Sequence, residues 1–328
     1  MNICYIFRNS KAGFSIAKVF NTFLPHIEKR TVVELPCPRA GIGSIIKNIV
    51  YLKRNVPKSD IYHLTGNVEY CALFLPRKKT ILTIHDLVLI NHNDYGRLKR
   101  LFFYYFWFYS SLKRAVLITC ISQKTKDDLL SYYPWVENKT IVIPNPVADE
   151  IKCLDSSFNK DYPIILHVGT RENKNLERVI EALDGISCEL RIIGDLNDVQ
   201  QELLDRYKIN YSIATNLTDI QIAEEYSKCD IVSFPSTYEG FGMPIIEGFA
   251  AGRIVVTSNI EPMISIANGN AILVNPYDVE DIRAGFLKAN DKEMREIMIK
   301  KGLEEVKKYS SVRVAELYMK VYKNVLRQ

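Results

Sequence analysis

Residues 234–252, FPSTYEGFGMPIIEGFAAG, lead from a predicted strand into a short predicted helix. The strand is the apolar run 229–234, Pro244 favours a first helical turn, and Gly252 favours the helix end. Gly240 and Gly242 carry no side chain, so a ligand could approach the backbone of the turn between strand and helix. The N–H groups at a helix start attract anions, which makes this segment a candidate phosphate site of an α/β fold.

The same alternation of strand and helix extends over the whole chain. Short apolar runs are separated by longer amphipathic stretches, which predicts βα units around parallel sheets. The predicted strands fall into two series, at 2–7, 31–35, 60–64, 80–85, 116–121 and 140–143, and then at 164–168, 189–193, 210–214, 230–234, 253–257 and 271–274. The proline-containing stretch 143–162 between them has the composition of a linker. We therefore predict two Rossmann-like domains, 1–150 and 151–308.

The last twenty residues predict a separate helix. Apolar residues recur there with a spacing of three and four, which places them on one helical face: Val312, Ala315, Met319, Tyr322 and Leu326. We expect residues 309–328 to pack back across the domain junction.

Two acidic residues, Glu239 and Glu247, flank the start of the predicted helix. Carboxylates beside an anion site are unfavourable unless they accept hydrogen bonds from a ligand. A sugar and a ribose would supply the required hydroxyls. The alternative is that both side chains are solvated carboxylates near the helix start, favoured by the helix dipole alone.

Glu239 and Glu247, with the intervening Gly-Phe-Gly-Met-Pro-Ile-Ile, resemble the E-x7-E motif of the family-4 retaining glycosyltransferases. The resemblance covers nearly the whole chain. Residues 167–182, HVGTRENKNLERVIEA, are similar to the strand, loop and helix that open the second domain of this family, where basic side chains hold the donor diphosphate. The resemblance implies the GT-B fold, an α/β architecture of two Rossmann-like βαβ domains with an interdomain cleft. The N-terminal domain would bind the acceptor, and the C-terminal domain the nucleotide sugar.

The resemblance also implies a set of donor-binding residues. Lys174 matches the family's lysine, and Arg171 would be its arginine; from the residues alone, both project from a turn at the carboxyl edge of a parallel sheet, where such folds bind ligands. The segment 10–15 corresponds to the family's glycine-rich first loop and contains one glycine. The full predicted set is Gly13, Gly169, Thr170, Arg171, Lys174, Glu239, Gly240, Phe241, Gly242, Met243 and Glu247.

His85 and Glu239 are the residues that the resemblance assigns to catalysis. The segment 80–87, TILTIHDL, resembles the family's strand that ends in His-Asp near the donor sugar. His85 would bind a sugar hydroxyl or help to stabilise charge in the transition state. The alternative is a buried histidine with satisfied hydrogen bonds. Asp86 is better interpreted as a structural partner or turn former than as a base.

Several other kinds of site are not supported. The segment Gly41-Ile-Gly-Ser44 lacks the third glycine of a dinucleotide fingerprint. Asp195 and Asp198 are interpreted as part of a helix cap, and GT-B enzymes of this type generally work without a bound metal. We therefore expect no metal and no cofactor beyond the donor substrate. The 43 basic and 38 acidic residues give a net charge of +5, too small to call for a nucleic-acid partner.

The segment 97–114 could face either a membrane or the protein core. Nine apolar or aromatic residues, 101–109, are flanked by Arg97, Lys99 and Arg100 on one side and Lys113 and Arg114 on the other. The run is too short to span a bilayer but could lie at an interface with anionic lipids. A second basic stretch carries Lys47, Lys53, Arg54 and Lys58. The alternative is a covering helix that is buried on most sides.

These features predict a cytoplasmic enzyme, with contact to the inner face of the cell membrane as a hypothesis. The seven cysteines form no C-x-x-C pair, and no signal peptide is recognisable. We expect a retaining hexosyltransferase that moves a sugar from a UDP- or GDP-linked donor to a growing, lipid-linked glycan in surface polysaccharide synthesis, of O-antigen (lipopolysaccharide) or capsule type. The alternatives are a nucleotide-sugar epimerase of the same fold and a non-catalytic sugar-nucleotide-binding protein.

Overall fold

The computed structural model describes residues 1–13, 15–38, 41–91, 95–154 and 157–327. Phe14, in the predicted first loop, lies outside the described residues. The chain forms two compact units, the first made of Met1–Pro146 and Ser311–Gln328, the second of Val147–Ser310. The sequence divides the chain instead after residues 150 and 308. The backbone N–H of Val147 already donates to the carbonyl of Tyr309 at 2.8 Å, which places 147–150 in the second unit.

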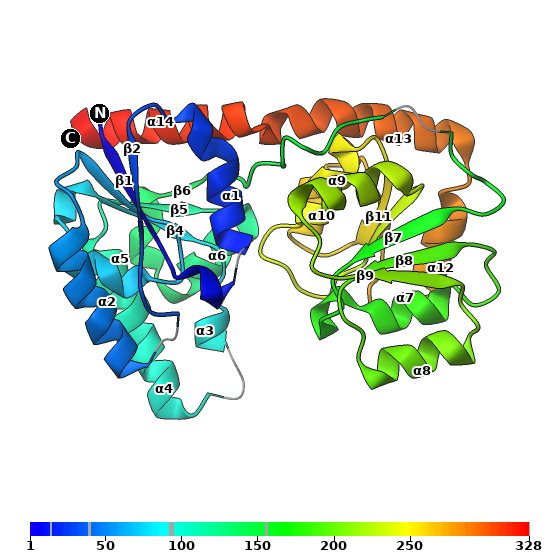
Figure 1. The fold of residues 1–328 in the computed structure, drawn as a ribbon, viewed down its shortest axis with the longest axis horizontal. Coiled ribbons are helices and arrows are strands. Elements are labelled where there is room, and N and C mark those ends of the chain that lie inside the picture. The colour runs from blue at the N-terminus through cyan, green and yellow to red at the C-terminus, as the bar shows by residue number, and fades with distance from the viewer. Residues whose placement is uncertain (14, 39–40, 92–94, 155–156, 328) are drawn as a thin grey trace. The chain divides into compact units, whose positions relative to one another are not determined.

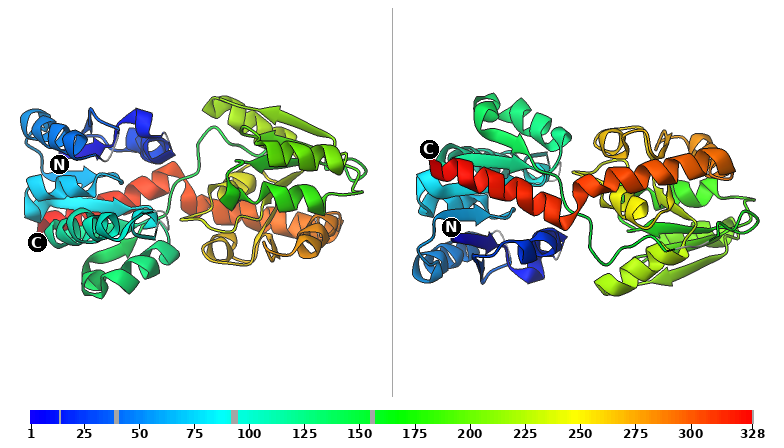
Figure 2. Two further views of the ribbon diagram at one scale, coloured as in Figure 1. Left: turned by 90° about the horizontal axis from the view of Figure 1, so that it is seen from below. Right: turned by 90° about the horizontal axis from the view of Figure 1, so that it is seen from above.

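Unit 1 contains a six-stranded parallel sheet with the order β2-β1-β3-β4-β5-β6. Its strands are β1 (Ile3–Phe7), β2 (Arg30–Glu34), β3 (Ile61–Leu64), β4 (Thr80–Ile84), β5 (Leu117–Cys120) and β6 (Thr140–Val142). Its helices are α1 (Ser15–Phe23), α2 (Ile42–Asn55), α3 (Val88–Asn91), α4 (Arg97–Phe102), α5 (Ser110–Arg114), α6 (Gln123–Tyr132) and α14 (Ser311–Arg327). All residues of β1, β3 and β4 are buried, as expected for parallel strands covered by helices on both faces (Figure 2).

Unit 2 contains a second six-stranded parallel sheet, with the order β12-β11-β10-β7-β8-β9. Figure 1 labels β7, β8, β9 and β11 of this sheet. Its strands are β7 (Ile164–Val168), β8 (Glu189–Ile193), β9 (Tyr211–Ala214), β10 (Ile231–Phe234), β11 (Ile254–Ser258) and β12 (Ile272–Val274). Its helices are α7 (Leu176–Ala182), α8 (Asp198–Arg206), α9 (Asp219–Lys228), α10 (Met243–Ala250), α11 (Met263–Ala267), α12 (Val279–Lys288) and α13 (Lys292–Glu305). The strand order reverses between β7 and β10, and ligands bind at such reversal points in α/β sheets.

The C-terminal helix α14 belongs to unit 1 and packs against α1. Its buried face is Val314, Ala315, Tyr318, Val321, Tyr322 and Val325. Tyr318 stacks on Phe23 with ring centroids 4.8 Å apart. The face expected from the sequence is therefore wrong in part, because Val312 and Leu326 are 50% and 44% exposed. The residues that contact the core instead follow a neighbouring 4,3,4 spacing: Val314, Tyr318, Val321 and Val325.

A buried hydrogen-bond network ties α14 to the sheet of unit 1. His63 Nδ1 and the Tyr322 hydroxyl lie 2.7 Å apart, and His63 Nε2 lies 2.7 Å from the Thr83 hydroxyl. The Tyr322 hydroxyl is also 3.0 Å from that of Tyr5. Burial lowers the pKa of His63 to about 3, so the ring is neutral at physiological pH. The network satisfies polar groups that would otherwise be costly in this core.

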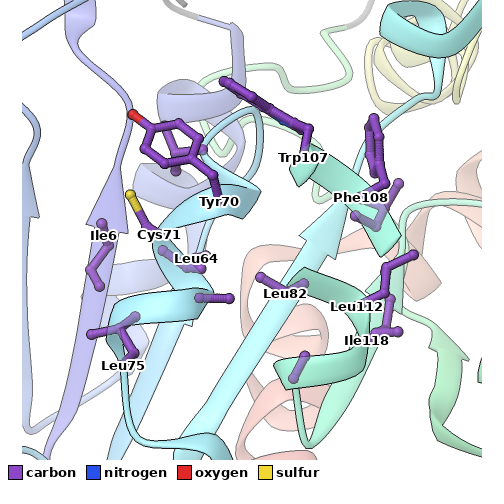
Figure 3. Close-up of a cluster of buried hydrophobic side chains, with 14 of the residues drawn as sticks. Ile6, Leu64, Tyr70, Cys71, Leu75, Leu82, Trp107, Phe108, Leu112 and Ile118 are labelled. Atoms are coloured by element: carbon purple, nitrogen blue, oxygen red, sulfur yellow. The ribbon is translucent and has the colours of Figure 1, made fainter. Parts of the chain in front are cut away.

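The aromatic segment 97–114 has one buried side and one exposed side. Residues Phe103–Tyr109 form a π-helix between α4 and α5. Trp107 and Phe108 are 2% exposed and, with Leu112, join the hydrophobic cluster shown in Figure 3. Leu98 is 85% exposed and Tyr105 is 56% exposed. The interpretation as a covering helix therefore holds for one side only. Within the described ranges, no helix is both long enough and apolar enough to cross a bilayer.

The substitution Tyr322→Phe tests the buried network. Phenylalanine keeps the ring but removes the hydroxyl that lies against His63 and Tyr5, so we expect a loss of about 1–3 kcal/mol in the free energy of unfolding. Urea denaturation measures this loss. Tyr105→Phe, at an exposed ring on the same unit, is the matched control and should change stability by less than about 0.5 kcal/mol. Equal stability of the two variants would contradict the assigned role of the network.

Candidate functional site

Two loops meet where the strand order of unit 2 reverses. One loop, Gly169–Lys174, follows β7, and the other, Pro235–Gly242, follows β10. The Asn175 side-chain amide donates to the carbonyl of Pro235 at 2.9 Å, and the N–H of Thr237 donates to the carbonyl of Asn173 at 2.9 Å. The loops that carry the two predicted motifs are therefore bonded to each other at the carboxyl edge of the sheet.

Lys174 and Glu239 form the centre of this site. Lys174 Nζ donates to Glu239 Oε1 at 2.6 Å, and their side chains are 21% and 16% exposed. Asn173 Nδ2 donates to the same carboxylate oxygen at 3.1 Å. The lysine stem lies on Gly169, where an added Cβ would come within 3.0 Å of Lys174 Cγ. A cation and a carboxylate predicted from separate motifs are thus in direct contact.

Thr170 and Arg171 occupy the same loop but differ in their surroundings. The Thr170 hydroxyl donates to the carbonyl of Asp195 at 2.6 Å, which fixes the loop against the end of β8. Arg171 is exposed. Among the described residues, no hydrogen bond or ion pair holds its guanidinium group, so it is available to a ligand from solution.

The second loop presents backbone rather than side chains at the start of α10. Gly242 precedes Met243 with a φ of 122°, and no side chain caps the helix. Gly240 and Met243 lie in the same turn. Phe241, a predicted donor-binding residue, is 3% exposed and packs against Tyr309 at a ring-centroid distance of 5.9 Å. Its side chain packs into the protein, so contact with a ligand would have to come from its backbone.

Glu247 lies inside α10 and is 7% exposed. The hydroxyl of Tyr226, on α9, donates to Glu247 Oε2 at 2.7 Å. The sequence gives no sign of this bond, because Tyr226 lies 21 residues earlier and belongs to no motif. The two predicted glutamates therefore have different environments: Glu239 in a loop beside a lysine, Glu247 in a helix beside a buried tyrosine.

His85 belongs to unit 1 and is 8% exposed. Its Nε2 lies 2.8 Å from the carbonyl of Thr65, and because a carbonyl only accepts, Nε2 donates and Nδ1 is the acceptor of the neutral ring. The ring passes so close to Gly66 that an added Cβ would lie 2.5 Å from His85 Cδ2. Burial is the largest cause of the lowered pKa of His85. The neighbouring Asp86 accepts from the N–H of Val88 at 3.1 Å, as expected for a turn former.

Gly13 also lies in unit 1, where it makes room for Arg8. Arg8 donates to the Gly13 carbonyl at 3.0 Å, and an added Cβ on Gly13 would lie 2.9 Å from the guanidinium group. Arg8 lines a cavity of about 180 Å³ together with Asn67 and Trp107. The indole N–H of Trp107 donates to Glu69 at 2.5 Å, and burial raises the pKa of Glu69 to about 7. Sequence reasoning missed Arg8, Glu69 and Trp107.

The segment 195–198 caps a helix as expected, but the capping side chain is that of Asn197 and not of Asp195 or Asp198. The Asn197 side chain accepts from the N–H of Gln200 at 2.9 Å and begins α8. Across the described part of the chain, no three His, Cys, Asp or Glu residues lie close enough together to hold a metal ion.

Comparison with known proteins identifies the family. Residues 18–151 match "Glycosyltransferase Family 4", and residues 153–305 match "Glycosyl transferases group 1". The serotype-specific mannosyltransferase WbdA of Escherichia coli is 25% identical over 84% of this chain. This chain spans 37% of the length of WbdA. The O-antigen chain mannosyltransferase B of E. coli is 24% identical over 72% of this chain and 68% of its own length.

A solved structure extends the likeness over both units. HepE of Anabaena, in complex with UDP and glucose, superposes with a TM-score of 0.74 at 14% identity and covers 99% of this chain and 100% of its own. At that identity the match shows the fold alone, and it agrees with the two parallel-sheet units expected from the motifs. With its two halves matched in sequence and in fold, the chain belongs to the family-4 glycosyltransferases of the GT-B fold.

Proposed function

We propose that this chain is a retaining glycosyltransferase that moves a hexosyl group from a nucleotide diphosphate donor to a growing, lipid-linked glycan of a surface polysaccharide. The observation that carries the proposal is the contact of Lys174 with Glu239 at the strand-order reversal of unit 2, beside the uncapped start of α10. The names of WbdA and mannosyltransferase B, and the UDP bound by HepE, support the reaction class and the donor class.

In this proposal the donor diphosphate binds between the two loops of unit 2. Lys174, Arg171 and the backbone N–H groups of 240–243 would donate to the phosphate oxygens. As the bond from the sugar carbon to the diphosphate breaks, negative charge grows on the leaving oxygen, where these preorganised donors lower its energy. The acceptor hydroxyl oxygen forms the new bond to the sugar carbon with retention of configuration, and its proton passes to the oxygen of the departing diphosphate. No metal is needed, because lysine, arginine and N–H groups supply the positive charge.

The carboxylates and His85 would bind hydroxyl groups in this proposal. Glu239, adjacent to Lys174, would accept from the sugar, and Glu247 from the ribose. His85 Nε2 donates to Thr65, so Nδ1 is the atom that could accept a hydrogen bond from a sugar hydroxyl. His85 would then orient the sugar rather than donate a proton.

The acceptor side of the proposal rests on unit 1. The exposed Leu98, Leu101 and Tyr105 lie in sequence beside Arg97 and Arg100. An open cavity of about 480 Å³ next to them is lined by Ile90, Tyr95, Arg97, Arg100, Leu101, Tyr104 and Tyr132. Helix α2 adds the exposed Ile42, Ile46 and Val50. Apolar side chains among cations favour peripheral contact with anionic lipids, which would bring the enzyme to a lipid-linked acceptor.

Nucleotide binding tests the donor site. We expect UDP or GDP to raise the melting temperature of the protein. At a ligand concentration a hundred times the dissociation constant, binding adds about 2.7 kcal/mol to the free energy of unfolding. Lys174→Ala removes the phosphate donor and should weaken binding roughly tenfold or more. Lys228→Ala is the matched control, because Lys228 is 63% exposed and pairs with Glu224 along α9, at 3.6 Å. Unchanged affinity in the Lys174 variant would refute the assignment.

Sugar transfer tests the reaction. We expect a nucleotide sugar and a membrane acceptor extract to give a product with the anomeric configuration of the donor, which NMR can determine. Glu239→Gln should reduce transfer roughly a hundredfold, whereas Glu224→Gln, on the exposed face of α9, should leave it unchanged. Conversion of the donor in the absence of acceptor would favour an epimerase. Full transfer by Glu239→Gln would place the active site elsewhere, whereas absence of transfer by the wild type would favour a non-catalytic binding protein.

Flotation with liposomes tests the membrane contact. The double substitution Leu98→Glu and Leu101→Glu places charge among the exposed apolar residues and should abolish binding to vesicles that contain anionic lipid. Ile220→Glu, at a residue of unit 2 that is 65% exposed, should bind like the wild type. Absence of wild-type binding with and without anionic lipid would remove the membrane proposal.

A further inference from the structure

The hydrogen bond between Tyr226 and Glu247 joins two helices of unit 2. Tyr226 lies in the last turns of α9 and is completely buried, and Glu247 lies in α10. Figure 1 labels both helices. The Tyr226 hydroxyl donates to Glu247 Oε2 at 2.7 Å. Burial raises the pKa of Tyr226 well above its usual value, so the hydroxyl stays protonated and can donate over the whole physiological range.

Arg253 fixes the backbone of Tyr226. Its side chain is 6% exposed, and its Nε donates to the Tyr226 carbonyl at 3.1 Å. A second guanidinium nitrogen donates to the carbonyl of Ser227. A cation at a helix C-terminus is favourable, and here it holds the end of α9. The N–H of Arg253 donates to the carbonyl of Gly248 at 2.9 Å, so the same residue also fixes the end of α10.

Gly248 allows α10, which carries the acceptor Glu247, to pack closely against the sheet. An added Cβ at Gly248 would lie 2.7 Å from Val255 Cγ2 and 3.1 Å from Val232 Cγ2. Helix α10 therefore lies directly on β10 and β11, with Glu247 next to the point of closest approach. Donor and acceptor of the hydrogen bond are each held by a packed helix, which leaves little freedom for the carboxylate to rotate.

We infer that Tyr226 is a positioning residue: its hydroxyl sets the orientation of the Glu247 carboxylate that accepts from the donor ribose. The inference rests on the proposed function, because it presupposes a nucleotide in this site. A carboxylate can accept about four hydrogen bonds, so the bond from Tyr226 leaves capacity for ribose hydroxyls. A buried carboxylate that is fixed in advance loses less conformational freedom on binding than one that must be ordered by its ligand.

The inference separates two parts of donor recognition. Lys174 and Arg171 would hold the diphosphate from the loop after β7, whereas Tyr226 acts only through Glu247. Loss of the Tyr226 hydroxyl should therefore weaken recognition of the ribose hydroxyls without weakening recognition of the diphosphate. A general loss of packing would weaken both.

Calorimetric titration with a nucleoside diphosphate and its 2′,3′-dideoxy form tests the inference. The probe is UDP or GDP, whichever stabilises the wild type. We expect the wild type to prefer the ribose form, and Tyr226→Phe to reduce this preference by about three- to tenfold, with little change in binding of the dideoxy form. Tyr211→Phe is the matched control, because the Tyr211 hydroxyl accepts from Gln201 at 2.8 Å at the edge of the same sheet. It should keep the wild-type preference.

Two further variants complete the design. In a Glu247→Ala background, Tyr226→Phe should cause no additional loss of ribose preference, since the carboxylate through which Tyr226 acts is already absent. Arg253→Lys keeps the charge but loses the two guanidinium bonds that hold the end of α9. Tyr226 should then be displaced and the preference for the ribose form lowered. This variant tests the inference even if Tyr226→Phe folds poorly.

The outcomes distinguish the inference from the proposed function. The positioning role is overturned if Tyr226→Phe weakens binding of the ribose and dideoxy forms equally, or if it leaves the preference for the ribose form unchanged. The proposed function stands in both cases. The same holds if the wild type binds both ligands equally. Failure of the wild type to bind UDP, GDP or their dideoxy forms overturns the proposed function itself.

Discussion

The reversal of strand order between β7 and β10 is the constraint on which the site of unit 2 depends. The chain leaves β7 toward β8 on one side and leaves β10 toward β11 on the other, so the two following loops diverge from adjacent strand ends. The bonds from Asn175 to Pro235 and from Thr237 to Asn173 bring the loops together again. These bonds place Lys174 beside Glu239.

The pairing of Lys174 with Glu239 is suited to an exchange of partners. The two side chains are 21% and 16% exposed, so leaving either charge without a partner would be costly. A phosphate oxygen would take the place of the carboxylate beside the ammonium group, which the lysine stem on Gly169 keeps in position. Glu239 would then become an acceptor for a sugar hydroxyl next to the phosphate.

The sequence predicts the strands and the site loops well, because both depend on local patterns. Parallel strands buried on both faces read as continuous apolar runs, and β4 and β7 lie within one residue of the predicted ranges. The turn at Gly240 and Gly242 and the Asn197 cap are local as well. The buried face of α14 is wrong in part because two overlapping helical spacings are apolar there, and only contact with α1 selects between them.

Contacts between distant residues could not be predicted. Phe241 stands between two glycines and resembles a ligand contact in sequence, yet it packs on Tyr309, which lies 68 positions further along the chain. The proximity of His85 to Gly66 depends on the pairing of β3 with β4. The Tyr226–Glu247 bond depends on how closely α10 approaches the sheet at Gly248.

The two glutamates of the motif illustrate how one sequence pattern supports different chemistry at each end. Glu239 lies in a loop and is paired with a cation, so it can change partners as a substrate arrives. Glu247 lies in a packed helix and accepts from the buried Tyr226 hydroxyl, which restricts the orientation of its carboxylate. In the proposed function, the buried glutamate is therefore suited to the ribose, which is unchanged in the reaction, and the loop glutamate to the sugar that is transferred.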